Sequence, residues 1–395
     1  MRYRKLKSDY IFDGGKLLND TNILVISPEG KVISIVNVNE AGEEIENFKG
    51  IISPGFVNAH CHLELSHLKN IIPEQTGLID FVFEVVSKRY LSKEEILSAV
   101  ENAEKEMYRN GIVAVGDICN YTTTLTQKIK RNLHYYNFVE ISGWLPQIAD
   151  LRFEKRKSSF DEFERNNLQA SIVPHAPYSV SEALWEKIIP FFPGKTITIH
   201  NQESADEDLF FKQGTGDFLR MFEKMKIDNS FYTSKKVRSV ESYFEKISNA
   251  ASTILVHNTF MKQEDLDFIH KHQKNQLVSF CLCPNANLYI EDRLPPVKLL
   301  LENDVHIILG TDSLASNHQL SILEEIKTIS KNYPEIKSET LLKWATANGA
   351  KALQMDSKLG TFEKGKTPGV ILIENVDGKE ITSQSKVRNL IDKRL

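Results

Sequence analysis

The chain has 395 residues, a length that suits one large domain with a second, smaller one. Apolar residues make up 41% and charged residues 26%, which is an ordinary globular composition and excludes a disordered or fibrous chain. The formal net charge of −4, from 49 Lys and Arg against 53 Asp and Glu, leaves no basic excess for binding nucleic acid.

The sequence also indicates where the protein works. Residues 1–15 are basic but lack the apolar stretch of a signal peptide. The apolar runs are far shorter than a membrane span requires. None of the 4 cysteines has the spacing of a secreted disulfide framework: Cys61, Cys119, Cys281 and Cys283. We therefore expect a cytoplasmic protein with no membrane partner and no nucleic-acid partner.

The two ends of the chain carry short strand patterns. Residues 22–37 predict a hairpin that turns at Pro28-Glu29-Gly30, and residues 359–383 have a similar texture. Neither end can bury a core alone. We therefore expect residues 1–52 and 357–395 to combine into one small β domain.

Residues 53–356 have a different pattern, in which apolar β-branched runs alternate with helical segments. Several runs are apolar at consecutive positions, as in parallel strands that are covered on both faces. The expected strands are 55–62, 111–119, 135–143, 170–176, 196–201, 253–258, 277–283 and 305–312. Eight strand–helix units predict an α/β fold, a (β/α)8 TIM barrel.

Local signals mark some of the helix ends. Ser92 with Glu95, and Ser179 with Glu182, fit capping boxes at helix starts. Gly111 stands where the first of these helices should end. The polar and aromatic stretch 203–250 is interpreted as an insertion near the mouth of the barrel.

Residues that can bind metal or move protons follow the expected strands. His60 and His62 are two apart, so on a strand they point to the same side while Cys61 points to the other. Further residues of this kind end or follow other strands: His200, Glu203, His257 and Asp312. The carboxyl ends of barrel strands form the active-site face. We therefore expect this set to meet there.

Weaker histidine and cysteine patterns favour structural interpretations. His270 and His272 have the same spacing as the first pair, but they lie in a helical pattern and do not share a face. Four other histidines are taken as ordinary polar residues: His67, His134, His306 and His318. Cys281 and Cys283 share a strand face and raise the alternative of a structural zinc site. The chain has no CxxC pair, so packing is favoured.

Imidazole and carboxylate groups suit a zinc-like ion that keeps one position open for water. Such an ion lowers the pKa of its water to about 7 and supplies hydroxide at neutral pH. The hydroxide needs a base, and the leaving group needs an acid. Asp312 and Glu203 could fill these roles.

Five motifs in chain order resemble the amidohydrolase superfamily: PGFVNAHCHLELS (54–66), HAPYSVS (175–181), IHNQES (199–204), LVHN (255–258) and LGTDSLASN (309–317). The sequence is most similar to the branch that holds cytosine, guanine and adenosine-type deaminases and the triazine chlorohydrolases. The resemblance covers nearly the whole chain. It implies that the domain built from both ends is a β-sandwich.

The resemblance also implies roles for single residues. The ligands of one divalent metal ion, Zn²⁺ or alternatively Fe²⁺, would be His60, His62, His200 and Asp312. Glu203 would be the proton shuttle, and His257 would contact the attacking water or the substrate oxygen. Binuclear relatives use a bridging lysine for which residues 171–177 offer no counterpart, so one metal is favoured.

We therefore expect a metal-dependent hydrolase of non-peptide C–N bonds that deaminates a purine-like heterocycle or nucleoside through a metal-bound hydroxide. The alternatives are release of chloride or of an acyl amide on the same scaffold, and a non-catalytic binding protein. The small-molecule substrate would contact Glu64, Trp144, His175, Tyr178 and the loop 203–220. The segment HLELSH (62–67) resembles aminodeoxyfutalosine deaminases. Glu64 and His175 offer hydrogen bonds suited to a polar heterocycle or a ribose, which favours an amino-purine nucleoside. A homodimer is expected for such barrels.

Overall fold

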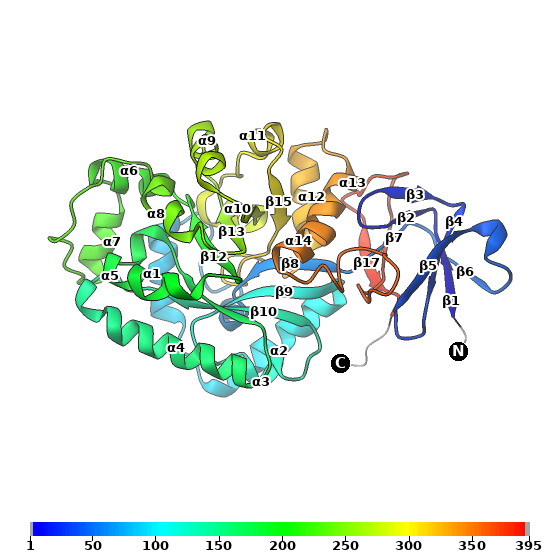
Figure 1. Ribbon diagram of the computed structural model, residues 1–395, viewed down its shortest axis with the longest axis horizontal. Helices are drawn as coiled ribbons and strands as arrows, with labels where there is room; N and C mark the ends of the chain where they lie inside the picture. Colours follow the sequence, from blue (N-terminus) through cyan, green and yellow to red (C-terminus); the bar gives the residue numbers. More distant parts are fainter. Residues whose placement is uncertain (1–2, 392–395) are drawn as a thin grey trace.

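The computed structural model describes residues 3–391, so residues 1–2 and 392–395 of the expected end domain lie outside the described part. Two four-stranded parallel sheets form the larger part of the α/β fold (Figure 1). Their strands are β8 (Phe56–Cys61), β9 (Ile112–Cys119), β10 (His134–Ile141), β11 (Ala170–Pro174), β12 (Thr196–Asn201), β13 (Ser252–His257), β14 (Leu277–Leu282) and β15 (His306–Leu309). Each expected strand is confirmed, with ends that differ by at most a few residues.

The strands pair in the orders β11-β10-β9-β8 and β12-β13-β14-β15. The two sheets adjoin at both edges. At one edge the backbone N–H of His200 donates to the carbonyl of His175 at 2.9 Å. At the other, Cys61 and Asp312 form an isolated parallel bridge. Because all neighbouring strands are parallel, their carboxyl ends lie on one face of the molecule.

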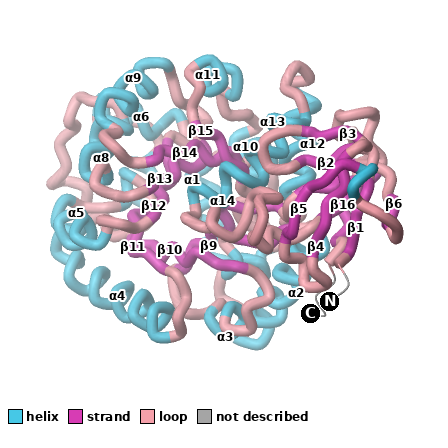
Figure 2. Tube along the Cα trace, turned by 45° about the vertical axis from the view of Figure 1, so that its right-hand side comes forward, coloured by secondary structure: helices cyan, strands magenta, loops and turns pink. Residues whose placement is uncertain are grey.

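Helices surround these strands on the outside (Figure 2). They are α1 (Leu78–Lys88), α2 (Lys93–Arg109), α3 (Leu125–Lys128), α4 (Ala149–Arg165), α5 (Glu182–Ile188), α6 (Ala205–Gln213), α7 (Phe218–Lys224), α8 (Ser239–Ile247), α9 (Gln263–His272), α10 (Pro284–Glu291), α11 (Val297–Glu302), α12 (Ile322–Asn332), α13 (Ser338–Lys343) and α14 (Gly349–Ala352). Within residues 3–391, none of the helices combines the length and apolarity of a membrane crossing.

One predicted capping box is confirmed and the other is wrong. Ser92 caps α2, and its side chain exchanges hydrogen bonds with Glu95. The helix ends at Arg109, and Gly111 has the expected left-handed backbone with φ +76°. However, α5 is capped by Ser181. Ser179 does not cap it, because its hydroxyl lies against His175 Nδ1 and the Ala176 backbone in the preceding turn.

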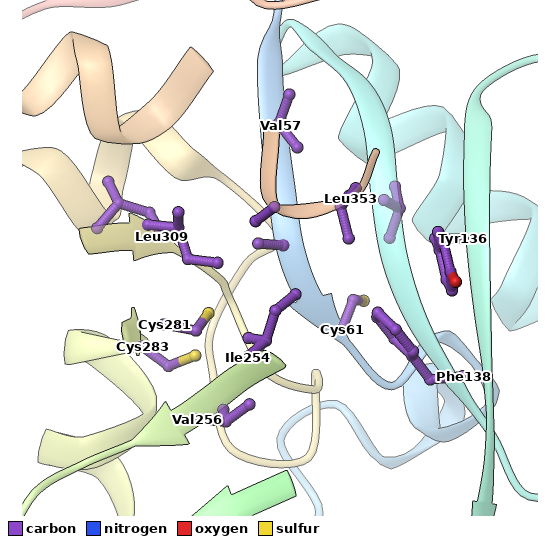
Figure 3. Close-up of a cluster of buried hydrophobic side chains, with 14 of the residues drawn as sticks. Val57, Cys61, Tyr136, Phe138, Ile254, Val256, Cys281, Cys283, Leu309 and Leu353 are labelled. Carbon is purple, nitrogen blue, oxygen red and sulfur yellow. The ribbon is translucent and has the colours of Figure 1, made fainter. Parts of the chain in front are cut away.

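The core between the sheets is apolar and includes the cysteines (Figure 3). Cys61 points away from its histidine neighbours and packs into this core, as its position on the strand predicts. Cys281 and Cys283 are also buried and free. Among residues 3–391, no group of side chains suited to a metal includes a cysteine. The packing interpretation therefore holds for these residues.

The chain ends form two further sheets: β5-β4-β1-β6 is built from the N-terminal end alone, and β17-β16-β7-β2-β3 combines strands from both ends. Their strands are β1 (Arg4–Lys7), β2 (Tyr10–Phe12), β3 (Leu17–Asn19), β4 (Asn22–Ile26), β5 (Val32–Asn37), β6 (Ile45–Asn47), β7 (Ile51–Ser53), β16 (Ile371–Glu374) and β17 (Lys386–Asn389). The predicted hairpin is confirmed as the antiparallel pair β4–β5. β16 pairs with β7, and one buried cluster joins Leu6 and Leu24 with Leu372. The two chain ends therefore meet (Figure 1).

Candidate metal centre and active site

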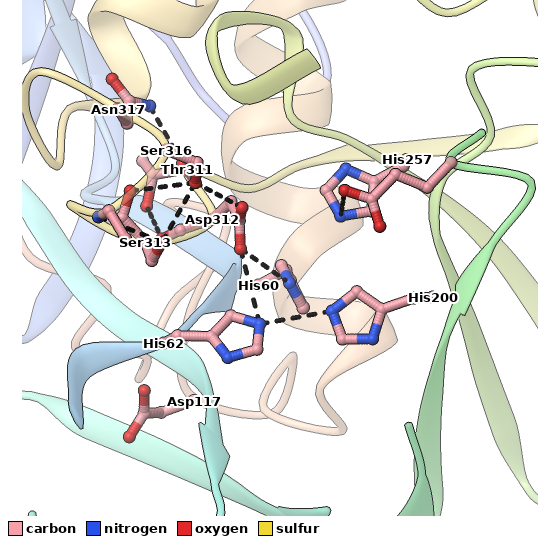
Figure 4. Close-up of polar contacts among 12 residues, drawn as sticks. His60, His62, Asp117, His200, His257, Thr311, Asp312, Ser313, Ser316 and Asn317 are labelled. Carbon is pink, nitrogen blue, oxygen red and sulfur yellow. Dashed lines mark hydrogen bonds and ion pairs between the residues drawn. The ribbon is translucent and has the colours of Figure 1, made fainter. Parts of the chain in front are cut away.

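Three histidines and an aspartate converge where the two sheets meet (Figure 4). His60 lies on β8 and His62 directly follows it, while His200 comes from β12. His62 Nε2 lies 3.3 Å from His200 Nε2. Asp312 Oδ1 lies 3.4 Å from both His60 Nε2 and His62 Nε2. Atoms that bind one tetrahedral ion at about 2.0–2.2 Å lie about 3.3–3.5 Å apart, so these separations fit a shared ion.

Unsatisfied nitrogen atoms at the centre support the same interpretation. His60 is fully buried: among residues 3–391 its Nδ1 has no hydrogen-bond partner, and its Nε2 has only the long 3.4 Å contact with Asp312 Oδ1. A buried polar atom without a partner is costly unless a ligand satisfies it. The ligand atoms of His60, His62 and His200 lie within 4.8 Å of one another. The donor set therefore fits a divalent ion.

Asp312 does not end β15, as the sequence predicted, but lies beyond its last residue, Leu309, with left-handed backbone at φ +57°. Its N–H donates to the His60 carbonyl at 3.1 Å. Ser316 Oγ donates to Asp312 Oδ2 at 2.5 Å, which leaves Oδ1 toward the histidines. Burial alone would raise the pKa of Asp312, but hydrogen bonding to His60 and the nearby imidazoles hold it well below its usual range. Asp312 is therefore a carboxylate.

The surrounding imidazoles are held neutral, the form that binds metal. Burial lowers the pKa of His200 to about 4 and that of His257 to about 3. Burial also lowers the pKa of His62 well below its usual value. His200 Nδ1 donates to the His175 carbonyl at 2.8 Å, which leaves Nε2 free for the ion.

Glu203 stands in the connection between β12 and α6, beside the ligand cluster. Its Oε1 lies 3.5 Å from His257 Nε2. Burial raises the pKa of Glu203 well above its ordinary value, and the charge of Asp312 adds to this effect. The side chain therefore keeps its proton more readily than an exposed glutamate does. Asn287 Nδ2 lies 3.4 Å from the other ring nitrogen of His257.

Three of the four residues expected to contact substrate lie near this centre. The His175 ring centroid is 4.9 Å from that of His200. The Tyr178 ring lies edge-on to His175, with centroids 6.0 Å apart. Glu64 is buried just after the ligand pair, and its Oε2 accepts from the Asn120 N–H at 3.1 Å. Burial raises the pKa of Glu64 to about 7.

The fourth residue, Trp144, is buried among other aromatic side chains. Its ring stacks on Phe222 at 5.5 Å, and its indole N–H donates to Asn229 Oδ1 at 2.7 Å. Other aromatic side chains surround it: Phe210, Phe231 and Tyr232. These contacts occupy one face of the ring and its polar group, so Trp144 packs against the segment that carries α6 and α7.

Two buried acidic residues near the metal centre were not predicted from the sequence. Glu140 on β10 places Oε1 3.6 Å from His200 Nδ1. Asp117 on β9 accepts from the Leu63 N–H, next to a ligand, at 2.8 Å and forms a fully buried ion pair with Lys128. Each stands near the carboxyl end of an apolar strand. A carboxylate at such a position is itself a signal for a site, and it was available in the sequence.

Comparison with known proteins identifies the family. The model of the Amidohydrolase family matches residues 51–393. The chain belongs to the amidohydrolase family. The sequence-based prediction of a metal-dependent amidohydrolase is therefore confirmed at the level of the family, whose members use a divalent metal ion.

This amidohydrolase has curated relatives of similar length. It is 27% identical over 404 residues to 5′-deoxyadenosine deaminase of Methanococcus vannielii, with 97% of this chain and 88% of that protein covered. It is 26% identical to 5-methylthioadenosine/S-adenosylhomocysteine deaminase of Thermoanaerobacter pseudethanolicus, with 91% and 81% covered. Its fold resembles that of Helicobacter pylori aminofutalosine deaminase in complex with methylthio-coformycin, with a TM-score of 0.80, 21% identity, and 96% and 93% of the two chains covered.

Proposed function

We propose that this amidohydrolase deaminates the adenine-type ring of a nucleoside, so that substrate and water give the oxo product and ammonia. The observation that carries the proposal is the buried pair of Glu203 and His257, 3.5 Å apart, beside a cluster of neutral imidazoles and a carboxylate. Relatives at 26–27% identity that are named as deaminases of adenosine derivatives support this substrate class.

The proposed cofactor is one divalent ion, with zinc favoured over iron. Its proposed ligands are His60, His62, His200 and Asp312, whose neutral imidazoles and ionised carboxylate are the forms that zinc accepts. Bound there, such an ion supplies Lewis acidity and makes water a stronger acid.

The chain's own groups would manage the protons. Glu203, whose pKa burial raises, would deliver a proton to a ring nitrogen and would then carry the proton of the new hydroxyl group to the departing amine. Asp312 is ionised and stands at the centre, so it would accept the proton that water loses. His257 would orient the attacking water or the new oxygen. His175, Glu64 and Tyr178 would hold the substrate, and Trp144 would support the wall behind them.

We also propose a domain architecture and an oligomeric state for this chain. Residues 53–356 would close as a (β/α)8 barrel, since the two parallel sheets adjoin at both edges. Residues 1–52 and 357–395 would form a β-sandwich, since their sheets share one buried cluster. A homodimer in solution is proposed and can be checked by light scattering after gel filtration.

The deciding experiment is an ammonia-release screen of the zinc-loaded enzyme over purines, pyrimidines, their nucleosides and triazines. We expect release from adenosine derivatives ahead of free cytosine and of amino-triazines. If only chloride or acyl groups are released, and no ammonia from any heterocycle, the enzyme is a hydrolase of the alternative kind and not a deaminase. No turnover at all would favour a binding protein.

A further inference from the structure

A group of basic side chains lies around Tyr121, outside the set described above. We propose that this cationic cluster of Arg89, Lys155 and Arg156 binds an acidic substituent of the substrate, a carboxylate or a phosphate. The inference rests on the proposed deamination, because it concerns a distal part of the same substrate. The substrates would then be nucleosides that carry an anionic substituent, a feature that the metal centre itself does not select.

The geometry of the cluster is compact. The Lys155 ammonium lies 5.0 Å from the centroid of the Tyr121 ring, and the Arg156 guanidinium lies 4.6 Å from it. The Arg89 guanidinium lies 6.0 Å from the same centroid. Arg89 follows α1, whereas the other two cations stand on α4. Tyr121 is 40% exposed, so the cluster is open to solvent.

The cluster has more positive charge than its neighbours neutralise. Arg89 contacts Glu64 Oε1 at 3.5 Å. Within residues 3–391, neither Lys155 nor Arg156 has a carboxylate at ion-pair distance. Burial alone would raise the pKa of Tyr121, but hydrogen bonding to Arg156 and the charges of all three cations lower it. This environment therefore stabilises negative charge at the phenol and would do the same for a bound anion.

Arg156 provides a second, independent observation. Its side chain is only 5% exposed, and Nε donates to the Glu140 carbonyl at 3.0 Å. Its Nη1 is buried without a hydrogen-bond partner in the described part of the chain. A buried guanidinium donor without an acceptor is costly, and a carboxylate or phosphate is the acceptor that fits it best.

The cluster connects to the metal centre through a short series of contacts. Asn120, next to Tyr121, donates its side-chain amide to Glu140 Oε2 at 3.3 Å and its backbone N–H to Glu64. Glu140 in turn faces His200. An anion at Tyr121 would therefore lie beyond the Asn120 side of the site. A nucleoside with its purine at the metal centre would point its sugar substituent toward the cations.

The test compares matched ligands on the zinc-loaded enzyme at low ionic strength. The neutral ligand is 5′-methylthioadenosine, the carboxylate is 5′-S-(2-carboxyethyl)-5′-thioadenosine, and the phosphate is adenosine 5′-monophosphate. We expect at least one of the two anions to exceed the neutral nucleoside in kcat/KM by about tenfold or more, mainly through KM. Which anion is preferred distinguishes a carboxylate subsite from a phosphate subsite.

Variants assign the preference to the cluster. Lys155→Ala, at an exposed position, should reduce the anion-to-neutral ratio of kcat/KM severalfold, and Arg156→Gln should reduce it further. Lys157→Ala is the matched control, because Lys157 is on the same helix but pairs with Asp161 at 2.5 Å, and it should keep the wild-type ratio. Equal kcat/KM for neutral and anionic ligands, or a ratio that survives both cluster variants, would overturn the subsite.

Calorimetric binding separates this inference from the proposed reaction. If no adenosine derivative is deaminated, the proposed function fails, and the subsite is judged by the Kd values of the same ligands. Tighter binding of an anion, lost in Lys155→Ala and kept in Lys157→Ala, still supports the cluster. Equal Kd values for the neutral and anionic ligands refute it.

Discussion

Glu203 is the residue whose role can be separated most cleanly from metal binding. Its carboxyl lies against His257, and Glu203 is not one of the side chains that converge on Asp312. Glu203→Gln keeps the size and polarity but removes the proton carrier. We expect kcat to fall by roughly 10²–10⁴-fold, with metal content unchanged. Steady-state ammonia release and elemental analysis of the same samples provide the measurement.

His200→Ala is the complementary change, since it removes a proposed ligand and should lower both the metal content and activity. The two variants therefore have different expected signatures. If Glu203→Gln lost metal to the same degree as His200→Ala, Glu203 would be a ligand and the assignment of the proton shuttle would be wrong.

Among the single residues of the site, the sequence predicted those that lie at a recognisable spacing from another site residue. His60 and His62 were found because two residues on a strand share a face, and Glu203 because it follows His200 by three positions. Glu140 was missed because it has no partner at a recognisable spacing, and only its position near the carboxyl end of an apolar strand marked it. The surroundings of Trp144 could not be predicted, because Phe222 and Asn229, which occupy it, come from a segment with no local signal.

The connection after β15 limits how the metal centre can be built. A Cβ atom added at Gly310 would lie 2.9 Å from His60 Cβ and 2.9 Å from Cys281 Sγ. Gly310→Ala should therefore push β8 and β15 apart and lower the free energy of unfolding by about 1–3 kcal/mol. Metal content should fall as well, since His60 and Asp312 lie on the two sides of this contact.

Gly15→Ala is the matched control for this change, because the nearest atom to its added Cβ is Asp13 Oδ1 at 3.6 Å and the position is exposed. Urea denaturation and zinc analysis of both variants check the expectation. A Gly310→Ala protein with wild-type stability and metal content would show that β15 can move away from His60 at no cost.

The junction of α6 with α8 should make stability depend on pH. Burial raises the pKa of Glu207 from 4.5 to about 8, although hydrogen bonds from Ser239 and from the Gln202 N–H lower it. The folded protein thus binds this proton more tightly than the unfolded chain. The stabilisation is complete below pH 4.5 and is lost as the pH rises to about 8.

Glu207→Gln imitates the protonated side chain and should flatten that decline in the free energy of unfolding between about pH 5 and pH 8. Denaturant titrations at several pH values measure the slope. The exposed Glu154→Gln variant should keep the wild-type slope. An unchanged slope in Glu207→Gln would mean that this carboxyl ionises equally in the folded and unfolded states.

For the whole molecule, the sequence predicted the strands better than the way the chain ends pack. Runs such as 196–201 and 253–258 are apolar at consecutive positions and bounded by turns, so their place in a parallel sheet follows from local pattern. The pairing of β16 with β7 joins residues that are far apart in the chain. The sequence indicated this pairing only because neither chain end can bury a core alone. No local pattern predicted which residues of β16 and β7 lie opposite each other.

The strands at the two chain ends should stabilise the large α/β part of the molecule as well as each other. Ile371 on β16 is fully buried and belongs to the same core cluster as β8–β15. A Cβ atom added at Gly111, in the turn before β9, would lie 3.1 Å from Cγ2 of Ile371. The Ile371 side chain therefore packs directly on the start of a central strand.

Ile371→Ala should lower the free energy of unfolding by about 2–5 kcal/mol, because it removes buried methyl and methylene groups and leaves a cavity. Leu151→Ala is the control, since that side chain is 70% exposed and its loss should change stability by no more than about 0.5 kcal/mol. Circular dichroism and zinc release should shift to lower denaturant together in Ile371→Ala, because the C-terminal strands and the metal-bearing strands share one core. If circular dichroism alone shifted and zinc release kept its wild-type midpoint, the chain ends would unfold separately and the shared core would not couple them to the metal centre.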